Sequence, residues 1–350
     1  MNRANEHVGY ACAYTPLPLI VAAGFVPYRL LPMTEAPDQA GRILHDNLCP
    51  HVKAILDRAM AGDHPPLAGM VLMNSCDAMR RLYDAWQTLP GRAPAVLIDL
   101  PVTADGSSIS FFAGELRRLA RTLEAWRGVE LTPERVRGGI AGYNEVAELL
   151  SALAVRVDRG ALADGPARLQ EMVNQAATSR FGESLSGLRE LLAEPERAPA
   201  EGVPLYLFGN VLPDPEAFRL FAACGARIAA SDLCTGTRLF QPIAAGAGEE
   251  DPFEAIAAAL LGRQPCARTF DPAHPLRLAD DVLERARAAG SRGVLCHTIK
   301  FCDPYQARLA AVRRVLQEAG MPLLVLEGDC TLRSIGQQRT RVEAFVEMLR

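Results

Sequence analysis

The sequence lacks the motifs by which enzymes most often bind nucleotides or a single catalytic metal ion. It contains no G-x-x-x-x-G-K-S/T phosphate loop, no G-x-G-x-x-G fingerprint after an expected strand, no G-x-S-x-G elbow and no H-E-x-x-H pair. It also lacks a C-x-x-C pair and any Cys/His set at zinc-finger spacing. These absences argue against ATP binding in a P-loop, NAD binding in a Rossmann turn and a structural zinc ribbon.

The chain has no excess of basic charge and no long apolar segment. Its formal net charge is -4 with charges of both signs interspersed, so we expect neither nucleic acid nor an acidic membrane as a partner. The apolar stretch 17–26 is a poor signal peptide, because Pro18 interrupts it and Arg3 is the one basic residue before it. No window approaches the roughly 18 apolar residues that span a bilayer. We therefore expect a cytoplasmic protein.

The chain does contain the alternation typical of α/β proteins. Its 350 residues, 49% hydrophobic, are enough for two domains with separate cores. Short runs rich in Val, Ile and Leu alternate with amphipathic helical stretches, which predicts parallel sheets. The expected strands are 25–31, 69–74, 95–100, 204–209, 226–231, 293–297 and 322–327. The expected helices around them are 18–23, 51–60, 78–87, 215–223, 252–261, 278–289, 306–319 and 338–349.

The middle of the chain has a different pattern. Residues from about 107 to 195 place apolar side chains three and four apart, which predicts helices, and Thr132-Pro133-Glu134 is a good helix start. The Ala/Pro/Glu-rich stretch 193–202 is typical of a linker. We therefore predict two Rossmann-like parallel-sheet lobes joined by a helical segment. The expected divisions are an N-terminal α/β lobe at 1–106, a helical segment and linker at 107–200, and a C-terminal α/β lobe at 201–350.

Cysteines are the most informative residues. An odd count of nine in a reducing compartment favours metal binding or catalysis over disulfides. Ligands of open α/β sheets bind beyond the carboxyl ends of the strands, and backbone amides there stabilise a thiolate. Six cysteines fall in such loops or at helix starts, three in each half: Cys12, Cys49, Cys76, Cys234, Cys266 and Cys302. A single free cysteine is usually a small buried hydrophobe, but six together predict a metal site assembled from distant parts of the chain.

Other polar and sulfur-bearing residues have a simpler interpretation. Cys224 falls at a helix end, Cys296 inside a strand and Cys330 after a strand, so we interpret all three as packing residues. Arg80 and Arg81 follow Cys76 and are expected either to form surface or interlobe ion pairs or to hold a phosphate or carboxylate of a ligand.

Five short stretches form an ordered set: 9–16 with 22–24, 74–77 with Arg80 and Asp84, 232–238, 300–305 and 340–345. Their order and spacing resemble the 2-hydroxyacyl-CoA dehydratase D-component family, which also contains benzoyl-CoA reductase subunits and double-cubane cluster proteins. The resemblance runs nearly end to end. One departure is that Leu17 and Pro18 stand where relatives usually carry acidic residues after the Tyr-x-Pro turn.

The resemblance implies an iron-sulfur enzyme with its cluster in the cleft between the two lobes. Low-potential electrons would come, one at a time, from a separate ATP-hydrolysing activator that carries its own 4Fe-4S cluster. The implied reaction is the dehydration or reduction of an acyl-CoA by a radical route, in a homodimer or a heterodimer with a homologous subunit. Thiolate ligands and burial suit such a low-potential cluster.

Several alternatives remain open. Three cysteines would hold one 4Fe-4S cluster with an open iron, whereas all six candidates would suit a double-cubane 8Fe-9S cluster in a reductase of small molecules. A non-catalytic cluster-binding or maturation protein of the same fold is a third possibility. A zinc enzyme, which would be colourless and free of labile sulfide, is a fourth.

Overall fold

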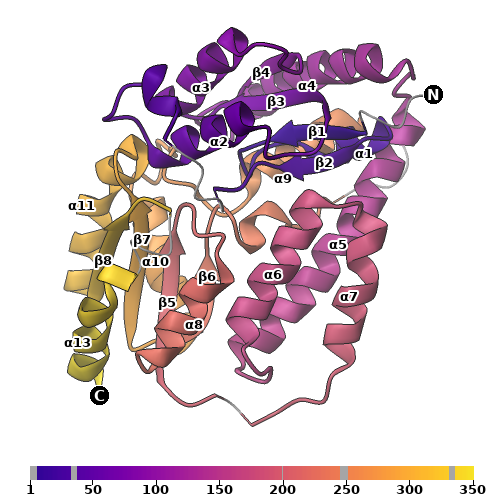
Figure 1. Ribbon diagram of the computed structural model, residues 1–350. Helices are drawn as coiled ribbons and strands as arrows, with labels where there is room; N and C mark the ends of the chain where they lie inside the picture. The colour runs from indigo at the N-terminus through magenta and orange to yellow at the C-terminus, as the bar shows by residue number, and fades with distance from the viewer. Residues whose placement is uncertain (1–5, 33–37, 199, 245–250, 331–335) are drawn as a thin grey trace.

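The computed structural model describes residues 6–32, 38–198, 200–244, 251–330 and 336–350. Two four-stranded sheets organise the chain (Figure 1). The first has the order β2-β1-β3-β4 and the second β6-β5-β7-β8, and each pairing within them is parallel. The strands are β1 (His7–Tyr10), β2 (Val26–Arg29), β3 (Leu67–Asn74), β4 (Ala95–Asp99), β5 (Val203–Gly209), β6 (Ala226–Asp232), β7 (Gly293–Ile299) and β8 (Leu323–Gly328). The prediction of two Rossmann-like lobes is confirmed.

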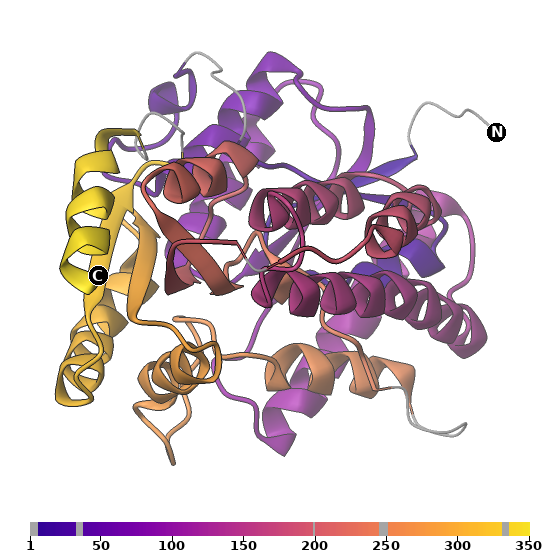
Figure 2. The same ribbon diagram turned by 90° about the horizontal axis from the view of Figure 1, so that it is seen from below.

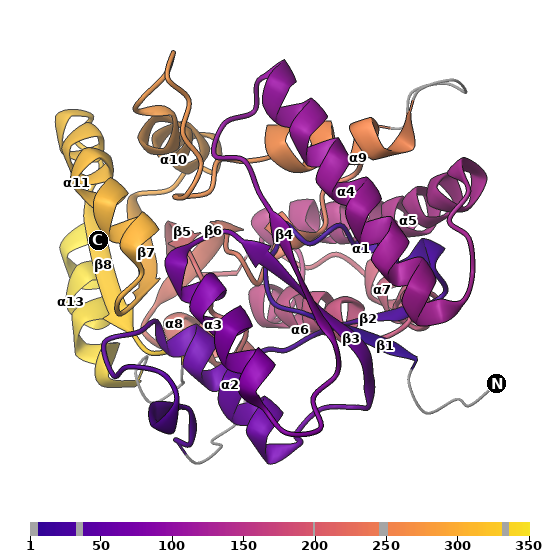
Figure 3. The same cartoon turned by 90° about the horizontal axis from the view of Figure 1, so that it is seen from above.

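Helices cover both faces of each sheet, as parallel strands require. On the first sheet, α2 and α3 pack on one face while α1 and α4 pack on the other (Figure 3). On the second, α8 and α13 lie opposite α10 and α11. These helices are α1 (Leu17–Ala22), α2 (Pro50–Ala61), α3 (Asp77–Thr88), α4 (Gly106–Arg127), α8 (Pro215–Ala223), α10 (Arg277–Ala288), α11 (Asp303–Glu318) and α13 (Arg339–Leu349).

The predicted helical segment is also present. It consists of α4, α5 (Pro133–Asp158), α6 (Gly165–Thr178) and α7 (Phe181–Ala193), of which α5 to α7 lie beside the second sheet (Figure 2). Thr132 caps α5 by accepting a hydrogen bond from the N–H of Arg135. Helix α9 (Pro252–Gly262) packs against α4 instead of the second sheet. The division of the chain near residues 106 and 200 into domains stays a prediction.

One central strand was missed from the sequence. Strand β1 pairs with both β2 and β3, although its four residues include Gly9 and His7, which dilute any strand signal. Gly9 is needed there because a methyl group would come within 2.7 Å of the sulfur of Met70. The prediction of three strands in the first half was therefore wrong, because the first sheet has four. None of the described helices is long and apolar enough to cross a bilayer.

The strand order creates a switch point in each sheet. The chain leaves the neighbouring strands β1 and β3 toward opposite faces, through α1 and α3. It leaves β5 and β7 toward opposite faces through α8 and α11 in the same way. Loops that diverge like this leave a crevice at the carboxyl ends of the two strands, which is where ligands bind in open α/β folds.

Helices α1 and α5 approach each other at Gly139. A methyl group at this position would lie 2.2 Å from the carbonyl oxygen of Pro18. Gly138 and Gly142, on the same helix, have no neighbouring atom within 4 Å of where a methyl group would stand. We expect Gly139→Ala to lower the free energy of unfolding by about 1–3 kcal/mol through overpacking. Gly138→Ala should leave it unchanged or raise it by up to about 1 kcal/mol, because alanine favours the helix. Urea unfolding followed by circular dichroism measures both, and an equal response of the two variants would contradict the packing argument.

Candidate functional site: a cavity lined by six cysteines

All six predicted cysteines line one cavity of about 100 Å³ between the lobes. The fold explains why. Cys12 follows β1 and Cys76 precedes α3, so they flank the switch point of the first sheet. Cys302 precedes α11 at the switch point of the second sheet. Cys49 stands before α2, Cys234 follows β6 and Cys266 lies in the loop after α9.

Three of the thiols, those of Cys49, Cys76 and Cys302, act on one another, but Cys12 also acts on Cys76 and Cys266 on Cys302. Burial, together with the nearby sulfurs of Cys302 and Cys76, raises the pKa of the Cys49 thiol to about 12. Burial likewise raises the pKa of Cys76 to about 11, opposed by backbone N–H groups at the start of α3. Burial also raises the pKa of Cys302, opposed by the N–H of Tyr305 and the side chain of Asn210. Without a bound cation, these three thiols therefore stay protonated.

The other three cysteines of the cavity are Cys12, Cys234 and Cys266. The Cys234 thiol donates a hydrogen bond to the sulfur of Cys266, which raises the pKa of Cys234 and lowers that of Cys266 to about 6. The charge of Arg238 lowers the pKa of both thiols, and its Nη1 lies 3.3 Å from the sulfur of Cys234. The charge of Cys12 also acts on Cys234. This pair therefore holds one thiolate at neutral pH, next to a guanidinium group.

Neighbouring thiols lie both within and across the lobes. Cys49 and Cys76 of the first lobe act on each other, and Cys302 of the second lobe acts on both. Cys12 acts on Cys76 in its own lobe and on Cys234 in the other. The six thiols therefore form one continuous set around the cavity.

Arginines surround the cavity. Arg29, Arg238 and Arg268 line it, and no Asp or Glu stands among the described residues that do. Arg238, with 1% of its surface exposed, forms a two-pronged ion pair with Asp232 at 2.7 and 2.6 Å. Arg29 is as deeply buried but is held by backbone carbonyl groups. The cavity therefore favours negatively charged contents.

His51 also lines the cavity, from the first turn of α2. Burial lowers its pKa to about 3, with the charge of Arg29 acting in the same direction. Its Nδ1 is buried and has no hydrogen-bond partner among the described residues. At neutral pH the ring is uncharged, so it contributes no compensating positive charge.

The donor set suits an iron-sulfur cluster, because six thiols surround one cavity. Within the described parts of the chain, no group of three or more His, Cys, Asp or Glu side chains is already arranged to hold a metal ion. Ligands of an iron-sulfur cluster each bind a different iron, so they surround a volume instead of a point. Thiolates are also the ligands that such clusters use.

Three further cysteines, interpreted from the sequence as packing residues, are all largely buried. Cys224 lies away from the cavity at the end of α8, with its sulfur 4.0 Å from the carbonyl oxygen of Arg339, and Cys296 is buried within β7. Cys330 is also buried. The nearby Cys49 and Cys302 raise its pKa in addition to burial, so Cys330 lies close to these two cysteines of the cavity.

Arg80 and Arg81 pair with Asp77 at 3.0 and 3.4 Å on the exposed face of α3, as the surface interpretation predicted. The cations that do line the cavity were missed. Arg29 falls at the end of a short strand and Arg268 in a loop without a motif, so spacing gave no signal for either. Arg238 stood within the resembling stretch 232–238, which was the one available clue.

Known proteins resemble this chain over nearly its whole length. The family model for the 2-hydroxyglutaryl-CoA dehydratase D-component matches residues 12–349. The chain is 21% identical to the (R)-phenyllactyl-CoA dehydratase beta subunit of Clostridium sporogenes, over 98% of this chain and 91% of the relative. It is 24% identical to the lactoyl-CoA dehydratase subunit beta of Anaerotignum propionicum, with the same coverage. It is 21% identical to the (R)-2-hydroxyglutaryl-CoA dehydratase subunit beta of Acidaminococcus fermentans, over 99% of this chain and 93% of the relative.

The buried pair of Arg238 and Asp232 yields a stability prediction. Arg238→Gln leaves the Asp232 carboxylate buried without its cation, so we expect the free energy of unfolding to fall by about 3–5 kcal/mol. Arg339→Gln is the control, because it removes the same charge from an exposed pair with Glu343. It should leave the urea concentration at the midpoint of unfolding nearly unchanged. Anaerobic urea unfolding of the cluster-free protein measures both. Equal midpoints for the two variants would show that the pair contributes no stability.

Proposed function

The chain belongs to the 2-hydroxyglutaryl-CoA dehydratase D-component family, and on this premise we propose that it is an iron-sulfur enzyme of reductive acyl-CoA dehydration. The proposal rests on one observation: six cysteines from distant parts of the chain line a single cavity between the lobes. The family match supports a dehydratase-type activity. The substrate class suggested by the relatives is a 2-hydroxyacyl-CoA.

A bound cluster would supply low-potential electrons, one at a time. The chain's own residues prepare the place for it. The thiolates are the ligands, and burial excludes water from them. Backbone N–H groups at the starts of α2, α3 and α11 offset part of the thiolate charge. Arg29, Arg238 and Arg268 offset more of it, which is needed because sulfide and thiolate make the contents strongly anionic.

The proposal includes partners. The matched relatives are named as beta subunits, which supports assembly with a second subunit, in a homodimer or a heterodimer. A separate ATP-hydrolysing activator with its own 4Fe-4S cluster would supply the electrons. The cytoplasm, where thiols stay reduced, is the compartment in which such a site persists.

A second candidate is a double-cubane 8Fe-9S cluster in a reductase of small molecules. The observation that favours it is the number of cysteines in the cavity, which is twice what one cubane with an open iron needs. Three of the six cysteines would serve each cubane.

Iron content separates these candidates. After strictly anaerobic purification, we expect about eight irons and matching acid-labile sulfide per chain for the double cubane and about four for a single cluster. If Cys76 and Cys266 hold different cubanes, Cys76→Ser and Cys266→Ser should each remove about half of the iron. Cys224→Ser, outside the cavity, is the control and should retain all of it. A colourless protein with zinc and no labile sulfide would refute the cluster.

Turnover is a separate test. Supplied with ATP, an activator reduced beforehand by a chemical reductant, and a 2-hydroxyacyl-CoA, the loaded protein with its partner subunit should release water and form the 2-enoyl-CoA, measured by mass spectrometry. Cys76→Ser should abolish the reaction. A fully loaded protein that forms no product from any acyl-CoA would instead support the non-catalytic cluster-binding alternative.

A further inference from the structure

A second cavity, of about 260 Å³, lies beside the loop that carries Cys266. One wall is formed by residues 102–105, after β4, and the other by residues from the segment 261–278. The N–H of Phe270 donates to the carbonyl oxygen of Val102 at 2.9 Å and joins the two walls. Thr269 lines the cavity, and both its N–H and its hydroxyl group donate to the carbonyl oxygen of Cys266, at 2.9 and 2.8 Å. The cavity is thus one loop away from the cysteines.

Three arginines line this cavity: Arg263, Arg277 and Arg308. Arg308, on α11, lies over the ring of Phe270 at 5.0 Å and donates two long hydrogen bonds, of 3.4 Å each, to backbone carbonyl groups. No carboxylate among the described residues pairs with it. Its charge is therefore available to a ligand.

Arg263 also has no carboxylate partner among the described residues, but only 7% of its surface is exposed and its guanidinium group lies over the ring of Tyr14 at 5.2 Å. Its Nη1 donates to the carbonyl oxygens of Ala13 and Arg238, at 2.9 and 3.0 Å. Its Nε is buried and has no hydrogen-bond partner among the described residues. A buried cation with an unused donor is unfavourable unless an anion lies nearby.

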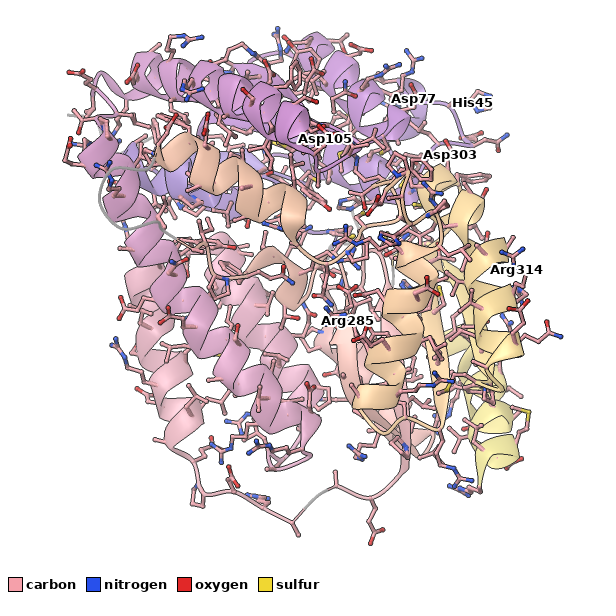
Figure 4. All side chains as sticks on the ribbon, turned by 180° about the vertical axis from the view of Figure 1, so that it is seen from behind. His45, Asp77, Asp105, Arg285, Asp303 and Arg314 are labelled. Carbon is pink, nitrogen blue, oxygen red and sulfur yellow. The ribbon has the colours of Figure 1, made fainter. Side chains whose placement is uncertain are left out.

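The two acids in the lining are already engaged. Asp105 caps α4, accepting hydrogen bonds from the N–H of Ser108 and the hydroxyl group of Ser107 at 2.9 and 2.5 Å (Figure 4). Asp271 accepts from the N–H of Ala273 at 3.0 Å and from Arg277 at 3.4 Å. Two carboxylates thus oppose three guanidinium groups, and both have backbone partners.

We propose that this cavity binds the phosphate group of a small molecule. Guanidinium groups present paired N–H donors that match phosphate oxygens, and a dianion balances more than one of them. The volume suits such a group with a short attached chain but is small for a whole drug-sized ligand. The phosphate could belong to a free phosphorylated metabolite or to a phosphorylated coenzyme such as coenzyme A. The second source rests on the proposed function; the first does not.

Calorimetric titration of the purified full-length protein with inorganic pyrophosphate tests the site. We expect Arg277→Gln and Arg308→Gln each to weaken binding about tenfold or more. Arg314→Gln is the matched control, since Arg314 is exposed on the outer side of the same helix as Arg308 and carries the same charge (Figure 4). It should bind pyrophosphate like the unaltered protein. Arg277 is 48% exposed, so its replacement should not unfold the chain, which circular dichroism verifies.

The outcomes are distinct. Absence of pyrophosphate binding, or equal weakening by all three substitutions, would overturn the site. Succinate binding as tightly as pyrophosphate would overturn the assignment to phosphate. Coenzyme A binding more tightly than pyrophosphate, with both weakened by Arg308→Gln, supports the coenzyme as the source, and equal affinities support a free metabolite. Iron content does not enter these titrations, so the failure of the cluster proposal would leave this result intact.

Discussion

The structure depends on buried and half-buried guanidinium groups that tie the two lobes together through backbone carbonyl oxygens. Arg29 donates from Nε to Ala11 at 3.1 Å and from Nη1 to Cys234 at 2.8 Å, so it holds a residue 205 positions further along the chain. Arg268 donates to Ser75 and Leu100, at 3.0 and 2.8 Å, from the opposite lobe. Each of these carbonyl groups belongs to a cysteine, to its neighbour or to a loop at the carboxyl end of a strand. The same cations therefore fix the loops and set the charge of the cavity between them.

The thiols of the cavity differ in their electrostatic environments. Cys49, Cys76 and Cys302 rely on helix-start amides and stay protonated without a bound cation, whereas Cys266 has a lowered pKa through Cys234 and Arg238. Burial opposes ionisation of these thiols, so positive charge must be brought in when all six sulfurs ionise together. The arginines supply part of that charge and the irons of the proposed cluster would supply the rest.

Much of this architecture follows from sequence, for identifiable reasons. Seven strands and the helices around them were predicted because Val-, Ile- and Leu-rich runs alternate with amphipathic stretches, and cysteines just after such runs had to lie at the ligand-binding edge. Strand β1 was missed because Gly9 and the short length conceal it. Arg29 was missed since nothing in sequence distinguishes a buried strand arginine from an exposed one. The grouping of the thiols depends on how the lobes meet, which no local pattern encodes. Ligation itself and the domain divisions remain predictions.

The origin of the thiols in both lobes has a mechanical consequence. Because the six sulfurs come from both lobes and line one cavity, a hinge motion between the lobes would separate the sulfurs of one lobe from those of the other. For a cluster held from both sides, as proposed, retention of the cluster and closure of the hinge would be a single linked equilibrium. Release of such a cluster would then require the lobes to open.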